Sequence, residues 1–176
     1  MEAHGFQPCE PNMEKSGFSR CGMNRLAERT FFVTSVTWER RALFRSERAA
    51  RLFLDALFEY RDQGTFQLYE FVLMPDHIHS LLAPKPTLAL ERVMQFIKGG
   101  YSHRFMKETG SRMEIWERGF TNHRIRDVVD YEKHRQYIHF NPVRARMVEA
   151  PQDYPYSSAH AGFRLDDAPQ RLKPVA

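Results

Sequence analysis

Two histidines separated by one residue, His77 and His79, stand in the stretch MPDHIHSLLAP, directly behind a Pro75-Asp76 turn. Alternate side chains of a β-strand point to the same side, so both imidazoles are expected on one face together with Leu81. Such a pair could bind one metal ion, although a catalytic metal site generally takes three protein ligands. The competing interpretation is two half-exposed strand residues, and for an isolated His-x-His motif that interpretation is favoured.

A tyrosine and an asparagine in the stretch HRQYIHFNPVRA offer the missing groups. Tyr137 and Asn141 are four positions apart, so on a helix they lie about 40° apart and share one face. Tyr131 is six positions before Tyr137, roughly 120° around the helix, and cannot share that face. The Asn141 oxygen would be a third metal ligand and the Tyr137 hydroxyl a nucleophile. The alternatives are a core tyrosine and a helix-terminal asparagine, and the conjunction with the histidine pair argues against them.

The elements that must position these groups follow from periodicity and turn residues. A stripe of apolar residues at helical spacing predicts a buried helix face that ends before Gly64. A Gly99-Gly100 pair predicts that the next helix is interrupted or loosened there. Pro142 is expected to bar a simple continuation of the last helix. The expected strands are 30–38, 66–74, 77–83 and 120–125, and the expected helices start at the N-caps Ser46, Thr87 and Asp127.

The resulting order, β-α-β-β-α-β-α, indicates an α+β sandwich in which helices cover one face of an antiparallel sheet. At 176 residues and 20.8 kDa the chain corresponds to about one domain. It contains no apolar run of the roughly 20 residues that a membrane span needs. We expect residues 1–27, with Cys9 and Cys21, to be a flexible leader and not a secretory signal, which favours a cytoplasmic protein.

Positive charge is concentrated in one part of the chain. Residues 91–126 hold eight Lys or Arg against four acids, so this segment alone supplies the net +4 of the chain. Aromatic residues are interleaved with these cations. On charge alone, a solvated helix face is slightly favoured over a surface that tracks the phosphates of single-stranded nucleic acid. If the second interpretation holds, the candidate phosphate contacts are Lys98, Arg104, Arg118, Arg124 and Arg126.

Three stretches in sequence order, MPDHIHSLLAP, IWERGFTNHRIRDVVDYEKHRQYIHFNPVRARMV and DYPYSSAH, resemble the REP-associated tyrosine transposases, a branch of the single-tyrosine HUH transposases. The resemblance covers residues 28–162 and leaves 163–176 as a C-terminal tail. It implies a ferredoxin-like sandwich with a central antiparallel sheet. It also implies that His77, His79 and Asn141 bind a divalent metal, Mg²⁺ or Mn²⁺, and that Tyr137 is the nucleophile.

The same resemblance implies the substrate and the reaction. Members of the family cut and rejoin single-stranded DNA hairpins of repetitive extragenic palindromes (REP elements) through a 5′-phosphotyrosine intermediate. A monomer is favoured, with a dimer as the alternative, and no membrane is involved. Two rival interpretations stay open. One is a protein that binds such hairpins without cutting them. The other is a histidine phosphoesterase, for which Leu81 stands where a third histidine would be needed.

Overall fold

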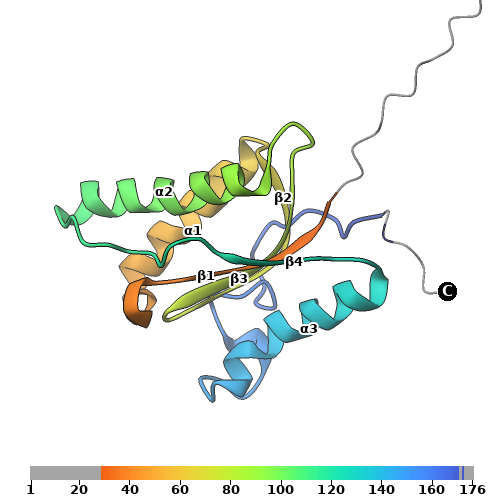
Figure 1. Ribbon diagram of the computed structural model, residues 1–176. Helices are drawn as coiled ribbons and strands as arrows, with labels where there is room; N and C mark the ends of the chain where they lie inside the picture. The colour runs from red at the N-terminus through yellow and green to blue at the C-terminus, as the bar shows by residue number, and fades with distance from the viewer. Residues whose placement is uncertain (1–28, 171, 173–176) are drawn as a thin grey trace, which may run out of the picture.

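A four-stranded antiparallel sheet in the order β2-β3-β1-β4 organises the chain (Figure 1). The computed structural model describes residues 29–170 and 172, so the expected leader with its two cysteines lies outside the described residues. The predicted element order and the ferredoxin-like sandwich are confirmed. The strands are β1 (Phe31–Val36), β2 (Phe66–Met74), β3 (His77–Pro84) and β4 (Thr121–Arg124), and the helices are α1 (Glu47–Asp62), α2 (Leu90–Thr109) and α3 (Val128–Arg144).

Helices cover both faces of the sheet, so the prediction of a single covered face is wrong. Helices α1 and α2 pack on one face, and α3 lies against the other (Figure 1). The α3 face carries Val72, Leu81 and Phe32 beside the histidines, and this apolar surface buries Tyr131 and Ile138 of α3. Burying such a surface stabilises the fold by about 25 cal/mol for each Å² of apolar area removed from water. The third helix is therefore part of the fold and not an appendage.

Two of the three predicted helix starts are confirmed. The Ser46 hydroxyl accepts a hydrogen bond from the Ala49 amide, and the Asp127 carboxylate accepts one from the Asp130 amide at 2.8 Å. The third is wrong, because α2 begins at Leu90 with no side-chain cap. The preceding residues form a turn, closed by a bond from the Leu88 amide to the Lys85 carbonyl. None of the helices within residues 29–170 is long and apolar enough to cross a membrane.

The expected interruption at Gly99-Gly100 is also wrong, since α2 runs through both residues. A Cβ atom at Gly100 would lie 2.3 Å from Cε2 of Tyr60, whose ring stacks on Phe96 at a centroid distance of 5.7 Å. Gly100 is therefore the place where α1 and α2 approach closely. A Cβ at Gly99 would meet nothing within 4 Å.

Helix α3 likewise continues past Pro142 to Arg144. A proline removes one backbone donor and crowds the carbonyl four residues earlier. Pro142 stands in the last turn of the helix, where only this one bond is lost and few residues follow. The helix therefore keeps Tyr137 and Asn141 on one continuous element, as the sequence analysis assumed.

The C-terminal part of the chain covers the outer edge of β2, and we call residues 154–166 the edge segment. The Leu73 amide donates to the Tyr156 carbonyl at 2.8 Å, and the Ser158 amide donates to the Phe71 carbonyl at 2.9 Å. The Tyr154 hydroxyl donates to the Leu73 carbonyl at 2.8 Å, and burial raises the pKa of this tyrosine to about 12. These contacts explain the DYPYSSAH motif as a cover for exposed backbone groups.

The edge segment extends beyond the expected start of the tail at residue 163. Phe163 packs edge-on against Phe71 at a centroid distance of 4.9 Å. Asp166 accepts two hydrogen bonds from the Arg61 guanidinium, at 2.9 and 3.0 Å, and a third from the Leu68 amide. The expected boundary between domain and tail stays a prediction, with these contacts lying on the tail side of it.

We expect Gly100→Ala to lower the free energy of unfolding by about 1–3 kcal/mol, the usual cost of overpacking, because the new methyl group displaces the Tyr60 ring. Gly99→Ala, one position away on the same helix, is the matched control and should raise stability by roughly 0.5–1 kcal/mol. Urea unfolding of both variants measures the difference. Equal effects of the two substitutions would contradict the close approach at Gly100.

We expect Asp166→Asn to destabilise the protein by about 2 kcal/mol at pH 7, because hydrogen bonds to charged groups contribute about 1.5–3 kcal/mol. Burial opposes ionisation of Asp166, but the bonds from Arg61 and Leu68 outweigh it and lower the pKa of the carboxyl group. A lowered folded-state pKa gives stability that is present above the unfolded pKa and lost as pH falls through the folded pKa. The difference in free energy of unfolding between Asp166→Asn and wild type should therefore become smaller below about pH 4. Urea unfolding at a series of pH values measures it. An unchanged difference at low pH would exclude the ionic contribution.

Candidate functional site

The two histidines of β3 are each held by a polar group at Nδ1. The Nδ1 atom of His77 donates to Oδ1 of Asp76 at 2.5 Å, and Nδ1 of His79 lies 2.7 Å from Oγ1 of Thr34. Thr34 reaches His79 because the antiparallel register of β1 and β3 pairs the two residues directly. With both Nδ1 atoms engaged, the Nε2 atom of each ring is the one left for another partner. Their ring centroids are 4.6 Å apart.

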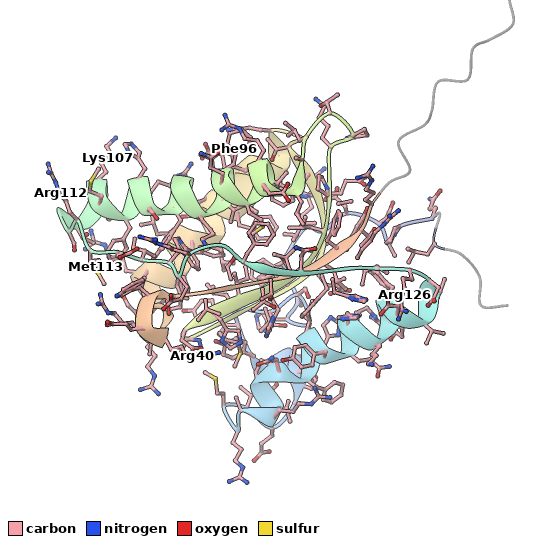
Figure 2. All side chains as sticks on the ribbon, viewed as in Figure 1. Arg40, Phe96, Lys107, Arg112, Met113 and Arg126 are labelled. Atoms are coloured by element: carbon pink, nitrogen blue, oxygen red, sulfur yellow. The ribbon has the colours of Figure 1, made fainter. Side chains whose placement is uncertain are left out.

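The charges around the pair favour a neutral His79 beside an ionised Asp76. Burial, together with the neighbouring His77, lowers the pKa of His79 to about 3. Burial opposes ionisation of Asp76, but the hydrogen bonds from His77 and from Arg40 outweigh it and lower the pKa of Asp76. Figure 2 shows Arg40 at the hairpin end of the sheet, where it makes its 3.1 Å ion pair with Asp76. A neutral His79 ring offers a lone pair to a metal ion, and Asp76 orients the neighbouring His77 ring.

Tyr137 of α3 lies over this pair. Its ring makes an edge contact with His79 at a centroid distance of 5.1 Å and another with Phe32 at 5.8 Å. The residue is 38% exposed, so a substrate can reach the phenol. Tyr131 is buried instead, in the packing between α3 and the sheet, and burial raises the pKa of its hydroxyl. Of the two tyrosines on this helix, only Tyr137 is therefore placed beside the histidines.

Asn141 stands one turn after Tyr137 and is half-buried. In Figure 1, α3 runs antiparallel to β3, so the turn that carries Asn141 lies toward the end of β3 at which His77 stands. The structure therefore brings His79 into contact with both His77 and Tyr137. Asn141 follows Tyr137 by one turn of α3, and its part in the site stays a prediction. Two imidazole nitrogens and one amide oxygen are ligands that divalent first-row metals accept.

Three of the five expected phosphate contacts have partners within the protein: Arg126 forms an ion pair with Asp130, and the other two lie on α2. Lys98 donates to the Glu117 and Gly119 carbonyls, and burial lowers the pKa of its amine. Arg104 forms an ion pair with Glu59 of α1. Both cations belong to α2, on the face of the sheet opposite to Tyr137. Their role in DNA binding stays a prediction.

The three expected cations outside α2 are exposed, and they differ in position. Arg118 lines a hollow of about 410 Å³ on the histidine side of the sheet, together with Thr34 and Arg40. Arg124 is paired with Phe31 across β1 and β4, so the alternation of the strand directs it toward the α2 side. Arg126 lies at the start of α3 (Figure 2). Arg118 thus shares a hollow with Thr34, the partner of His79.

Sequence reasoning missed two residues that hold the site together and one that lies against the tyrosine. Thr34 and Phe32 sit in a β-branched and aromatic strand pattern that indicates core packing and gives no hint of their contacts with His79. Arg144 places its guanidinium 5.4 Å from the centre of the Tyr137 ring. Its spacing of seven from Tyr137 is two helical turns, which is the one signal that could have indicated this contact.

Fold and site together define a small transposase of the single-tyrosine kind. The family model described as "Transposase IS200 like" matches residues 29–141, and the chain belongs to this family. The match includes every residue from Thr34 to Asn141 described above for the site.

Among its relatives are REP-associated tyrosine transposases, which confirms the resemblance seen in the sequence. A protein of Escherichia coli K12 with that name is 24% identical over 75% of this chain and 81% of its own length. A Haemophilus influenzae protein assigned to the same group is 31% identical over 60% of this chain, and the match spans 65% of that relative. A solved REP-associated tyrosine transposase, bound to a REP hairpin, shares the fold with a TM-score of 0.65 at 21% identity. That match covers 85% of this chain and 93% of the solved one.

Proposed function

We propose that this transposase cuts and rejoins single-stranded DNA at REP-type hairpins, with Tyr137 as nucleophile and with a divalent metal held by His77, His79 and Asn141. The observation that carries the proposal is the contact of the exposed Tyr137 ring with His79, whose Nδ1 is engaged by Thr34. This contact supports a nucleophile role for the Tyr137 hydroxyl next to an imidazole pair whose Nδ1 atoms are both engaged. The rival histidine phosphoesterase gives Tyr137 no role.

The residues present fit a divalent cation. Asp76 and Thr34 orient the two rings in the way that metal-binding histidines are commonly supported by a hydrogen bond at the second nitrogen. Two histidines and an asparagine would leave coordination positions open for a phosphate oxygen and water. When bound, Mg²⁺ or Mn²⁺ would polarise a non-bridging phosphate oxygen and offset the charge of the transition state.

The chemistry assigned to Tyr137 conserves the energy of the DNA bond. The phenol oxygen forms a bond to phosphorus, the bond from phosphorus to the 3′ oxygen breaks, and the phenol proton ends on that oxygen. The products are a 5′-phosphotyrosine and a free 3′-hydroxyl, which can attack the phosphotyrosine and restore a phosphodiester. The Arg144 guanidinium adds positive charge beside the ring as the phenol loses its proton.

Substrate contacts are proposed for the same side of the sheet. The hollow bordered by Thr34, Arg40 and Arg118 is linked to the histidines through Thr34, the partner of His79, and its volume lies in the range of small-molecule binding pockets. The two arginines would contact backbone phosphates there. The REP hairpin as the DNA ligand is supported by the relatives named above. A protein that binds hairpins without cutting them is the second candidate function, and the following experiment separates the two.

We expect Tyr137→Phe to abolish the covalent protein–DNA adduct while DNA binding persists, because only the attacking oxygen is removed. The assay incubates each protein with a 5′-labelled and a 3′-labelled REP hairpin and Mn²⁺, denatures the mixture, and separates adducts by gel electrophoresis. Tyr131→Phe, which removes a buried phenol from the same helix, is the matched control and should still form the adduct.

Each other outcome of this assay rejects a specific part of the proposal. An adduct that survives in Tyr137→Phe would reject the assigned nucleophile. Cut DNA without any adduct from wild type would favour a hydrolase. Binding of wild type with neither product would favour the non-cutting hairpin binder.

We also expect Thr34→Val to weaken Mn²⁺ binding by about 10–100-fold, the usual effect of removing a partner that orients a metal ligand. Valine matches threonine in shape but leaves Nδ1 of His79 without its partner. Ser35→Ala is the control, because the Ser35 hydroxyl is buried on the other face with no hydrogen-bond partner among the described residues. Calorimetric titration with Mn²⁺ measures both variants. Similar affinities for Thr34→Val and wild type would show that Thr34 does not position the histidine.

A further inference from the structure

A second cluster of ligand-type side chains lies on the same face of the sheet, outside the site described above. It consists of His123 on β4 and of Asp130 and His134 on α3. The Nε2 atom of His123 lies 2.8 Å from Oδ2 of Asp130. Nδ1 of His134 donates to the Asp130 main-chain carbonyl at 2.7 Å and lies 3.3 Å from Oδ1 of the Asp130 carboxylate. The two imidazole rings are stacked with centroids 4.8 Å apart. No function assigned so far uses these three residues.

The donor set has the composition of a transition-metal site. The three candidate ligand atoms all lie within 4.8 Å of one another. Bonds of about 2.0–2.2 Å to Zn²⁺ place two ligand atoms of one ion up to roughly 4 Å apart, so small side-chain rotations bring all three into range. Two imidazoles with one carboxylate favour Zn²⁺ and its neighbours Co²⁺ and Ni²⁺ over Mg²⁺ or Ca²⁺, which prefer oxygen ligands.

The buried charge of Asp130 supports the presence of a cation. Asp130 is 7% exposed. His123 and the backbone and side chain of Arg126 all make hydrogen bonds to its Oδ2 atom. A buried carboxylate requires a positive or hydrogen-bonding partner. Arg126 fills this role at 3.3 Å through a side chain that is 75% exposed, so it can move into solvent when a metal takes its place.

The cluster is accessible and separate from the first site. The His123 side chain is 41% exposed, which gives an ion a path from solvent and leaves room for water as a further ligand. The Phe32 ring packs against both clusters, at 5.3 Å from the His79 ring and 4.7 Å from the His134 ring. The two clusters therefore border one phenylalanine but share no ligand.

We propose that His123, Asp130 and His134 form a second divalent-metal site, selective for Zn²⁺-type ions, that fastens α3 to β4. His134 is three residues before Tyr137, so an ion bound here would fix the helix turn that carries the nucleophile. This site does not depend on DNA cleavage. It would stabilise the folded protein by mass action, because the unfolded chain does not bring the three ligands together.

The test uses the full-length chain with the other strong metal ligands removed. The background protein carries His77→Ala and His79→Ala, and also Cys9→Ser and Cys21→Ser, since thiolates bind Zn²⁺. Calorimetric titration with Zn²⁺ should show one site in this background. Adding His123→Ala should lower the Zn²⁺ affinity of that site by more than about 100-fold, because it removes a ligand itself. Losing a residue that only supports a ligand typically costs about 10–100-fold. His103→Ala, which removes an exposed histidine from α2, is the matched control and should leave the site unchanged.

A second measurement makes the outcome independent of a folding defect. Thermal unfolding in EDTA establishes that each variant folds. Added Zn²⁺ should then raise the unfolding temperature of the background and of the His103→Ala protein, and should leave that of the His123→Ala protein unchanged. The proposal is overturned if the background binds no Zn²⁺. It is equally overturned if His123→Ala and the background bind Zn²⁺ with the same affinity, or if His103→Ala weakens binding as much as His123→Ala.

Discussion

The register between β1 and β3 is the constraint on which the site depends. It pairs Thr34 with His79, so that a hydroxyl from one strand meets the Nδ1 atom of an imidazole on the next. A slip of one residue would turn Thr34 to the other face of the sheet and expose the core side of β1. The register is itself fixed by burial, because Val33 and Phe32 pack into the cores on opposite faces. The packing that stabilises the sheet thus also determines which ring nitrogen stays available.

Helix α3 places the exposed Tyr137 ring against a sheet that carries two histidines. Its buried residues Tyr131 and Ile138 pack on the sheet, and the Asp127 cap fixes its first turn directly after β4. With so short a connection, the helix lies over its own sheet, and Tyr137 contacts His79 of the same chain. Relative to the sheet, Tyr137 is held by the packing of Tyr131 and Ile138 on both sides of its position in the helix.

Much of this arrangement could be predicted from the sequence, because strand alternation and helix spacing are local properties. They were sufficient to put His77 and His79 on one face of a strand, and Tyr137 and Asn141 on one face of a helix. What failed depends on contacts between distant segments. Gly100 appeared to be a helix breaker because Tyr60, which needs the space, is forty residues away. The second covered face was missed because the apolar residues beside the histidines become a continuous surface only once three strands are paired.

The edge segment determines when the outer edge of β2 becomes covered during synthesis of the chain. The strand next to His77 and His79 in the hairpin, β2, keeps a bare row of backbone groups until residues 154–166 reach it. During synthesis these residues leave the ribosome after every residue of the site. A nascent chain therefore holds all its reactive groups while one border of its sheet is still open to other strands, a state prone to aggregation. That border is covered only when residues 154–166 have been made and have paired with β2.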